Sequence, residues 1–213
     1  QSHRLDDRRG CKSRARLAEL ERLEDRTLLA GVYPNDPEFP TQWALNNTGQ
    51  TGGLYDADID MPEAWSITTG SMATVIAVLD SGIDYTHPGV YLNIWLNQGE
   101  IPLAISASLT DVDGDGIFTF RDLNATANAP YVINLNGNGY IDGGDLLNDS
   151  RWENGLDDDG NGKVDDVIGW DFRDDDNDPQ CTTNCHGLEM AQRLAAMGND
   201  GGGMVGVRWT AQL

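Results

Sequence analysis

The sequence has few basic residues and a large excess of acidic ones. Its 213 residues include 14 Lys and Arg against 35 Asp and Glu, which gives a formal net charge of −21. A nucleic-acid partner needs a basic face that displaces the counterions of the phosphate backbone, so this composition argues against nucleic acid. The surplus of carboxylates favours divalent cations as partners instead.

Long apolar runs are also absent. The longest sizeable one is the 7-residue stretch from Ala73 to Leu79, interrupted only by Thr74. A membrane-spanning helix needs about 18 to 20 apolar residues in succession, so we expect no membrane span. A positively charged start followed by an apolar stretch, which marks an ordinary signal peptide, is not visible either.

Cysteine is scarce, with three residues at Cys11, Cys181 and Cys185. Three cysteines are too few for a disulfide framework. Cys181 and Cys185 are close enough in sequence to close one small ring, and His186 follows them directly. This spacing leaves three interpretations open: a small disulfide, two free thiols, or a metal or haem attachment one residue longer than the usual C-x-x-C-H pattern.

The basic residues concentrate in a leader, residues 1–30, which holds 8 of the 14 Lys and Arg. A weak helical pattern in the leader indicates a surface helix or a tail. The segment Leu23-Glu-Asp-Arg-Thr-Leu-Leu29 resembles the N-terminal segment of a class of bacterial exported proteins. That resemblance implies an extracellular, secreted or cell-surface protein of a bacterium.

The remaining chain shows few regular elements. Residues 31–72 are rich in Pro and turn residues, with a short helix expected near 61–66. Residues 73–79 form an apolar, β-branched run that predicts a strand buried on both faces of a parallel sheet, with Asp80 at its carboxyl end. An apolar stripe at helical spacing predicts a helix over 186–198, with an ion pair between Glu189 and Arg193 on its exposed face. Residues 204–209 have the pattern of a second strand.

An acidic motif repeats three times at intervals of 23 residues, starting at positions 111, 134 and 157. Each copy has Asp or Asn at positions 1, 3 and 5 and Gly at position 6, which is the frame of a calcium loop. A solvated acidic linker is the simpler interpretation, but apolar residues such as Phe118 and Ile141 argue against permanent disorder. The usual Glu at position 12 is absent, so we expect weak calcium binding, on the order of 0.1 to 1 mM. The predicted calcium ligands are Asp111, Asp113, Asp115, Asp122, Asn134, Asn136, Asn138, Asp142, Asp145, Asp157, Asp159, Asn161 and Asp165.

Two segments resemble the aspartate and histidine segments of subtilisin-like serine proteases. They are Val75-Ile-Ala-Val-Leu-Asp80-Ser-Gly-Ile-Asp84 and Cys185-His186-Gly187, the latter followed by the Gly-rich stretch after Ala195. The approach through Gln42-Trp-Ala-Leu-Asn-Asn-Thr-Gly and Met61-Pro-Glu-Ala-Trp65 is similar to the lead-in of the thermitase-like members. The resemblance implies an α/β fold of three layers with a mainly parallel sheet, present here as an incomplete N-terminal half. It also implies four parts: the leader 1–30, the aspartate strand region 31–102, an inserted pair of calcium loops 103–152, and a continuation 153–213 with the third acidic loop and the histidine helix.

The resemblance further implies a serine endopeptidase that hydrolyses polypeptides and is stabilised by calcium. Asp80 would orient the imidazole, and His186 would act as general base toward a serine. No Gly-Thr-Ser-Met-Ala segment follows His186, and Ser71 in Gly-Ser-Met-Ala stands 9 residues before Asp80, so we interpret it as a turn residue. Loss of a triad serine typically costs about 10⁶ in kcat, so this chain alone is expected to be inactive.

A second departure from the family follows the histidine. The family continues Thr-His-Val-Ala-Gly after His-Gly, whereas this chain has Leu188 and Glu189, and Glu189 would act electrostatically on His186. The alternative hypothesis is a non-catalytic extracellular calcium-binding module on a degenerate protease scaffold. A haem protein attached through Cys181, Cys185 and His186 is a third and remote hypothesis.

Overall fold

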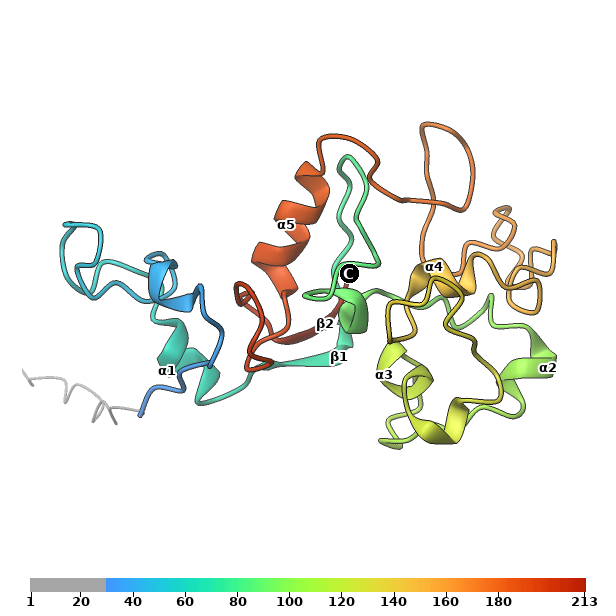
Figure 1. Ribbon diagram of the computed structural model, residues 1–213, viewed down its shortest axis with the longest axis horizontal. Coiled ribbons are helices and arrows are strands. Elements are labelled where there is room, and N and C mark those ends of the chain that lie inside the picture. The colour runs from blue at the N-terminus through green and yellow to red at the C-terminus, as the bar shows by residue number, and fades with distance from the viewer. Residues whose placement is uncertain (1–29) are drawn as a thin grey trace, which may run out of the picture.

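The computed structural model describes residues 30–213, which form short helices and strands joined by long loops (Figure 1). Residues 1–29, which make up nearly all of the predicted basic leader, lie outside the described residues. None of the helices in residues 30–213 combines the length and the apolar character that crossing a membrane requires. The regular elements are α1 (Met61–Trp65), β1 (Gly70–Val75), α2 (Leu103–Ser106), α3 (Phe120–Leu123), α4 (Gly143–Leu146), α5 (His186–Ala195) and β2 (Thr210–Gln212), with 3₁₀ turns at Phe39–Thr41, Tyr91–Asn93 and Thr126–Asn128.

The sheet consists of β1 and β2, which pair in parallel although they lie far apart in the sequence. The Gln212 side chain strengthens the pairing by donating a hydrogen bond to the carbonyl of Met72 at 2.7 Å. A parallel strand pair with helices agrees with the α/β class that the sequence predicts. The three-layer arrangement with a larger sheet stays a prediction.

The predicted strand over 73–79 is wrong in its bounds and in its burial. The strand ends at Val75, which is 56% exposed, and Leu79 beyond it is 88% exposed. A parallel strand is buried on both faces only where helices pack over both faces of its sheet. Within residues 30–213, Ile76 and Val78 pack against the buried core, while Val75 before them and Leu79 after them stay exposed, so the run is covered on one face only.

The second predicted strand, over 204–209, is also wrong, because those residues close the C-terminal end of α5 instead. The backbone amides of Gly206, Val207 and Arg208 donate to the carbonyls of Ala196, Arg193 and Leu194. These contacts hold the chain against the helix, and β2 begins only at Thr210.

Helix α5 begins at His186, as predicted, and ends at Ala195, three residues before the predicted end. Ala196 is extended, and the amide of Met197 donates to the carbonyl of Gly89 rather than continuing the helix. The buried side chains of the helix belong to the main core, while the ion pair of Glu189 with Arg193 lies on the exposed face at 3.4 Å, as predicted.

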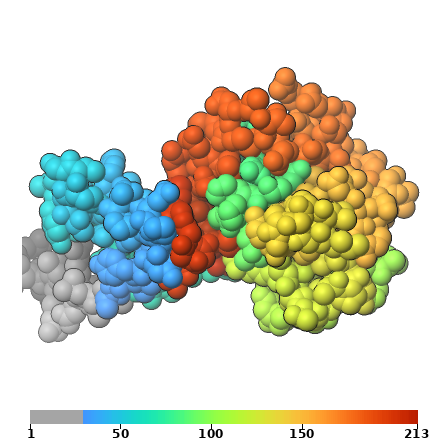
Figure 2. All heavy atoms as spheres, in the orientation of Figure 1, coloured from blue at the N-terminus to red at the C-terminus, as the bar shows by residue number. Residues whose placement is uncertain are grey.

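Two groups of buried side chains hold the described residues together. The larger group joins residues 103–152 to the region around β2 and α5, with Phe120 and Trp152 fully buried in it. The smaller group contains Phe39, Met61 and Trp65 and lies in the N-terminal part of the described residues. Figure 2 shows this part, in blue and cyan, beside the C-terminal residues, in red. The division of the chain into the four predicted parts remains a prediction.

Candidate active site and candidate metal sites

Asp80 and His186 lie side by side although 106 residues separate them. Asp80 follows the apolar run that begins with β1, and His186 is the first residue of α5. The His186 Nδ1 atom is 2.8 Å from Asp80 Oδ2 and 2.9 Å from Asp80 Oδ1. We call these two residues the candidate catalytic pair.

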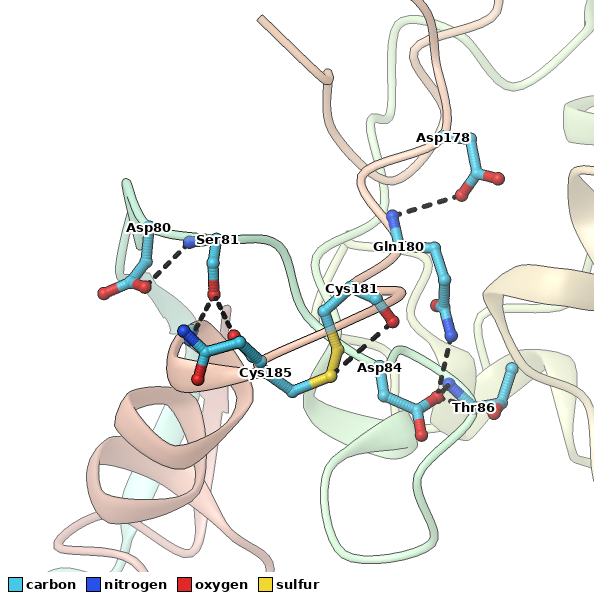
Figure 3. The surroundings of a disulfide bond; sticks show 10 residues. Asp80, Ser81, Asp84, Thr86, Asp178, Gln180, Cys181 and Cys185 are labelled. Atoms are coloured by element: carbon cyan, nitrogen blue, oxygen red, sulfur yellow. Dashed lines mark hydrogen bonds between the residues drawn. A yellow bond between two sulfur atoms is a disulfide. The ribbon is translucent and has the colours of Figure 1, made fainter. Parts of the chain in front are cut away.

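A close approach of two backbones produces this juxtaposition. The position that a Cβ would occupy on Gly187 is 2.2 Å from the carbonyl oxygen of Gly82, so only glycine allows the helix to start there. Gly82 itself has a φ of +89°, which favours glycine. Ser81 joins the two segments, since its hydroxyl accepts a hydrogen bond from the Gly187 amide and donates to the Asn184 carbonyl, each at 3.1 Å. Asp80 and Ser81 stand beside the disulfide in Figure 3.

The contact with Asp80 determines which ring nitrogen of a neutral His186 carries the proton. The hydrogen bond from His186 lowers the pKa of the Asp80 carboxyl, and the Ser81 amide, which donates at 2.7 Å, lowers it further. An ionised carboxylate only accepts hydrogen bonds, so the proton of a neutral His186 lies on Nδ1. Nε2 is then free to accept a proton, and the His186 side chain is 56% exposed.

Ser71 and Glu189, the other two side chains that the sequence analysis considered, make no hydrogen bond with the candidate catalytic pair. Ser71 is part of β1, not of a turn, and its hydroxyl accepts a hydrogen bond from the Ala73 amide at 3.2 Å. Among residues 30–213, no serine hydroxyl makes a hydrogen bond with His186. The Glu189 carboxylate pairs with Arg193 and makes no hydrogen bond to His186.

Cys181 and Cys185 form a disulfide with a Cα–Cα distance of 5.3 Å (Figure 3). Of the three interpretations that the spacing left open, the structure has the first. With both sulfur atoms bonded to each other, no thiol of this pair is available for a metal or a haem. The disulfide closes a small ring directly before α5 and restrains the segment that leads to His186.

The first acidic loop gathers three of its four predicted ligands. The carboxylates of Asp111, Asp113 and Asp115 each place an oxygen within 4.8 Å of the others. Burial raises the pKa of Asp113, and the neighbouring charges of Asp115 and Asp122 add to that shift. An oxygen-only cluster of this kind suits a hard cation such as calcium. Asp122 is buried below the loop, where its oxygens accept hydrogen bonds from Val112 and Thr119 and cap α3.

The second loop follows the same backbone course but gathers less charge. The side-chain amides of Asn136 and Asn138 donate to the Asp142 carboxylate, and Asn134 accepts from the amide of Gly137. Asp145 occupies the position of Asp122 and caps α4 in the same way. The repeat is therefore structural, with a loop followed by a capped helical turn in both copies.

The third loop is built differently from its predicted ligand set. Asp157 accepts from the amides of Asn161 and Gly162, as Asp111 does from its own loop. The Asp165 carboxylate turns to the amides of Asn154 and Gly155. Asp159 instead joins Glu100 and Asp166, whose carboxylate oxygens lie within 4.8 Å of one another.

The repeat pattern missed Glu100 and Asp166. Asp166 lies next to the predicted Asp165, so a shift of one residue within the loop separates the two. Glu100 precedes the whole repeat, and no local pattern connects it with residues 157–166. Burial raises the pKa of both carboxyls, and the charge of Asp159 adds to each shift.

Known proteins resemble this chain over its central and C-terminal parts. The profile of the subtilase family matches residues 71–213, more than half of the chain. Neuroendocrine convertase 2 of Drosophila melanogaster is 34% identical over 84 residues, which cover 39% of this chain and 12% of that protein. PC3-like endoprotease variant B of Hydra vulgaris is 37% identical over 78 residues, 37% of this chain and 11% of that protein. Neuroendocrine convertase 2 of Mus musculus is 42% identical over 62 residues, 29% of this chain and 10% of that protein.

These matches correct one prediction and leave another untested. The expected bacterial location is wrong, because the matched relatives are convertases and endoproteases of animals. That prediction rested on the resemblance of residues 23–29 to an export segment of bacterial proteins, and a motif of seven residues is too short to identify the source organism. The thermitase-like lead-in, from Gln42 to Trp65, lies outside the family match. The matched segments amount to about a tenth of the length of those relatives. The match over residues 71–213 shows that the chain belongs to the subtilase family.

Proposed function

We propose that the candidate catalytic pair of Asp80 and His186 serves a serine endopeptidase of the subtilisin type, acting on polypeptides. The observation that carries this proposal is the contact of His186 Nδ1 with both Asp80 oxygens at 2.8 and 2.9 Å. A carboxylate that holds Nδ1–H leaves Nε2 as the base that takes a proton from a nucleophile. Membership of the subtilase family supports the same chemistry.

Each residue of the pair has a separate role. Asp80 fixes the ring orientation and tautomer, and its negative charge stabilises the imidazolium that forms when Nε2 accepts a proton. His186 is the general base and then the general acid toward the leaving amine.

The proposed reaction requires a serine nucleophile that the described residues do not bring to His186. Among the residues of the structure, no serine hydroxyl contacts His186, while the ring is more than half exposed. A segment that packs against the open side of β1 and the exposed edge of the ring would bring a serine to Nε2. The exposed apolar side chains of Val75 and Leu79 lie on the segment that leads to Asp80 and give such a segment a surface to cover.

Calcium binding is part of the proposal. The Asp111, Asp113 and Asp115 carboxylates form the best-gathered ligand set among the predicted loops. A cation there would relieve the repulsion of three neighbouring carboxylates and would stabilise the loop before α3. The second loop, with one carboxylate among amides, would bind more weakly.

The test is peptidase activity of the full-length gene product, measured on a fluorogenic peptide mixture with and without EGTA. We expect His186→Ala to lower kcat by about 10⁶ and Asp80→Asn by about 10⁴. Ser71→Ala, which changes a serine outside the pair, is the control and retains full activity. A fully active His186→Ala variant would refute the peptidase role. Calcium-dependent folding without any peptidase activity would favour the alternative, a calcium-binding module, which the Asp111, Asp113 and Asp115 cluster supports.

A further inference from the structure

A second cluster of carboxylates joins residues that lie before and after the segment 103–152 in the sequence. Glu100 precedes the segment, and Asp159 and Asp166 follow it. Their carboxylate oxygens lie within 4.8 Å of one another. We propose that Glu100, Asp159 and Asp166 bind one hard divalent cation, calcium, and that this cation fastens the residues before this segment to those after it. The site does not depend on the peptidase proposal.

Glu100 points to a missing ligand. Its side chain is 1% exposed, and its Oε1 accepts a hydrogen bond from the Asp159 amide at 3.0 Å. Its Oε2 is buried and has no hydrogen-bond partner. A buried carboxylate oxygen without a partner is costly and calls for a specific cause. No Lys or Arg among residues 30–213 forms an ion pair with Glu100, Asp159 or Asp166, so a bound cation would supply the positive charge that these groups need.

Two asparagine side chains hold the other carboxylates in place. Asn97 Nδ2 donates to Asp159 at 3.0 Å and to Asp166 at 2.9 Å. Asn161 Nδ2 bridges the same two carboxylates at 3.0 Å each. The orientation of both amides is fixed, because their oxygens accept hydrogen bonds from the backbone amides of Gly99 and Lys163. The carboxylates are thus aligned by hydrogen bonds that do not use up all their acceptor positions.

The donor set selects the kind of ion. All three ligands are carboxylate oxygens, which suit Ca²⁺, Mg²⁺ or Mn²⁺ rather than Zn²⁺ or Cu²⁺. The oxygens come from two separate segments and have no octahedral arrangement imposed by a single loop. Calcium tolerates such irregular geometry and completes its shell with water, whereas magnesium demands near-ideal octahedral geometry.

The cation would act as a clamp close to the core. The amide of Asn97 donates to the carbonyl of Val167 at 2.8 Å, so the two segments already run side by side. A cation between Glu100 and the pair of aspartates would join them a second time. The loops of residues 103–152 would then be held at a fixed base.

The test is calcium binding by the 213-residue chain and its Glu100→Gln variant. Glutamine keeps the shape of the side chain and an oxygen that accepts the Asp159 amide hydrogen. Calorimetric titration with calcium chloride after treatment with EGTA counts the ions, and hydrogen–deuterium exchange locates them. We expect the variant to bind one ion fewer, or that ion at least tenfold more weakly. We also expect it to lose the calcium-dependent protection of residues 97–100 and 157–167.

The matched control is Asp158→Asn, which removes one carboxylate charge from the third loop, beside Asp159 but outside the cluster, and keeps the full number of ions. Equal stoichiometry and affinity in Glu100→Gln and the parent would overturn the proposal, as would a parent without calcium-dependent protection at 157–167. If Glu100→Gln does not fold, Asp166→Asn takes its place and the same losses are expected. A parent protected at 157–167 but not at 111–117 would support this site and contradict calcium binding at the first loop.

Discussion

The closest backbone contact in the candidate active site predicts the effect of a single methyl group. In Gly187→Ala the new Cβ would lie 2.2 Å from the Gly82 carbonyl oxygen, 3.1 Å from its carbon and 3.2 Å from Asp80 Cβ. Normal contacts between heavy atoms lie near 3.5 Å, so the start of α5 and the turn after Asp80 must separate by roughly 1 Å. His186 precedes Gly187, and its distance of 2.8 Å to Asp80 would exceed the hydrogen-bond range.

The magnitude combines two opposing terms. Alanine favours a helix over glycine by about 1 kcal/mol, whereas forcing a methyl group into a packed site costs about 1 to 3 kcal/mol. Because the atom in the way is a backbone carbonyl, we place the cost at the upper end and expect a net loss of about 1 to 2 kcal/mol. For a chain of this size that corresponds to a fall in Tm of about 2 to 8 °C.

Two measurements check this prediction. Thermal unfolding followed by circular dichroism gives the change in Tm, and a carbon-13 titration of the Asp80 carboxyl gives its pKa. The pKa is lowered chiefly by the hydrogen bond from His186, so it should rise in the variant. Gly53→Ala is the control, since a Cβ there meets only side-chain atoms at 3.8 Å. An unchanged Tm together with an unchanged Asp80 pKa in Gly187→Ala would refute the reasoning.

Three further predictions concern the pair, the core and the disulfide. His186→Gln should raise the pKa of Asp80, which is lowered in the folded parent. The parent should therefore be more stable than the variant at neutral pH, and this difference should shrink as the pH falls through the lowered pKa. Urea unfolding at several pH values measures the difference. Phe120→Ala removes a fully buried ring and should cost about 3 to 5 kcal/mol, whereas Phe172→Ala, with a ring that is 80% exposed, should change stability by less than about 0.5 kcal/mol; equal losses in denaturant unfolding would contradict the assigned core. Reduction of the disulfide should destabilise the chain by about 2 kcal/mol, since the closed loop is short; a Tm that dithiothreitol leaves unchanged would argue against a structural role.

Local patterns were sufficient to predict the candidate catalytic pair. The apolar run ending at Asp80 and the stripe beginning at His186 are both visible within short windows, and the family resemblance connects them. Helix α5 starts at the predicted residue because its buried positions recur at helical spacing. The predicted burial of the first strand on both faces was wrong, because burial depends on the segments that pack over each face, which the sequence of one strand does not describe.

The acidic repeat shows where local reasoning ends. Its backbone frame repeats as predicted, and the first loop gathers Asp111, Asp113 and Asp115. The cluster at Glu100 and Asp166 depends on two segments, before residue 103 and after residue 152, that fold against each other. A pattern within one loop cannot identify a ligand that comes from another segment.

The central claim is that Asp80 holds the Nδ1–H of His186 and leaves Nε2 free as a base. Nitrogen-15 NMR of the His186 ring in the 213-residue chain, at a pH where the ring is neutral, tests it most directly. We predict a protonated Nδ1 with a downfield, hydrogen-bonded proton that disappears in Asp80→Asn. A ring protonated on Nε2, or a spectrum that is the same in Asp80→Asn, would contradict the account.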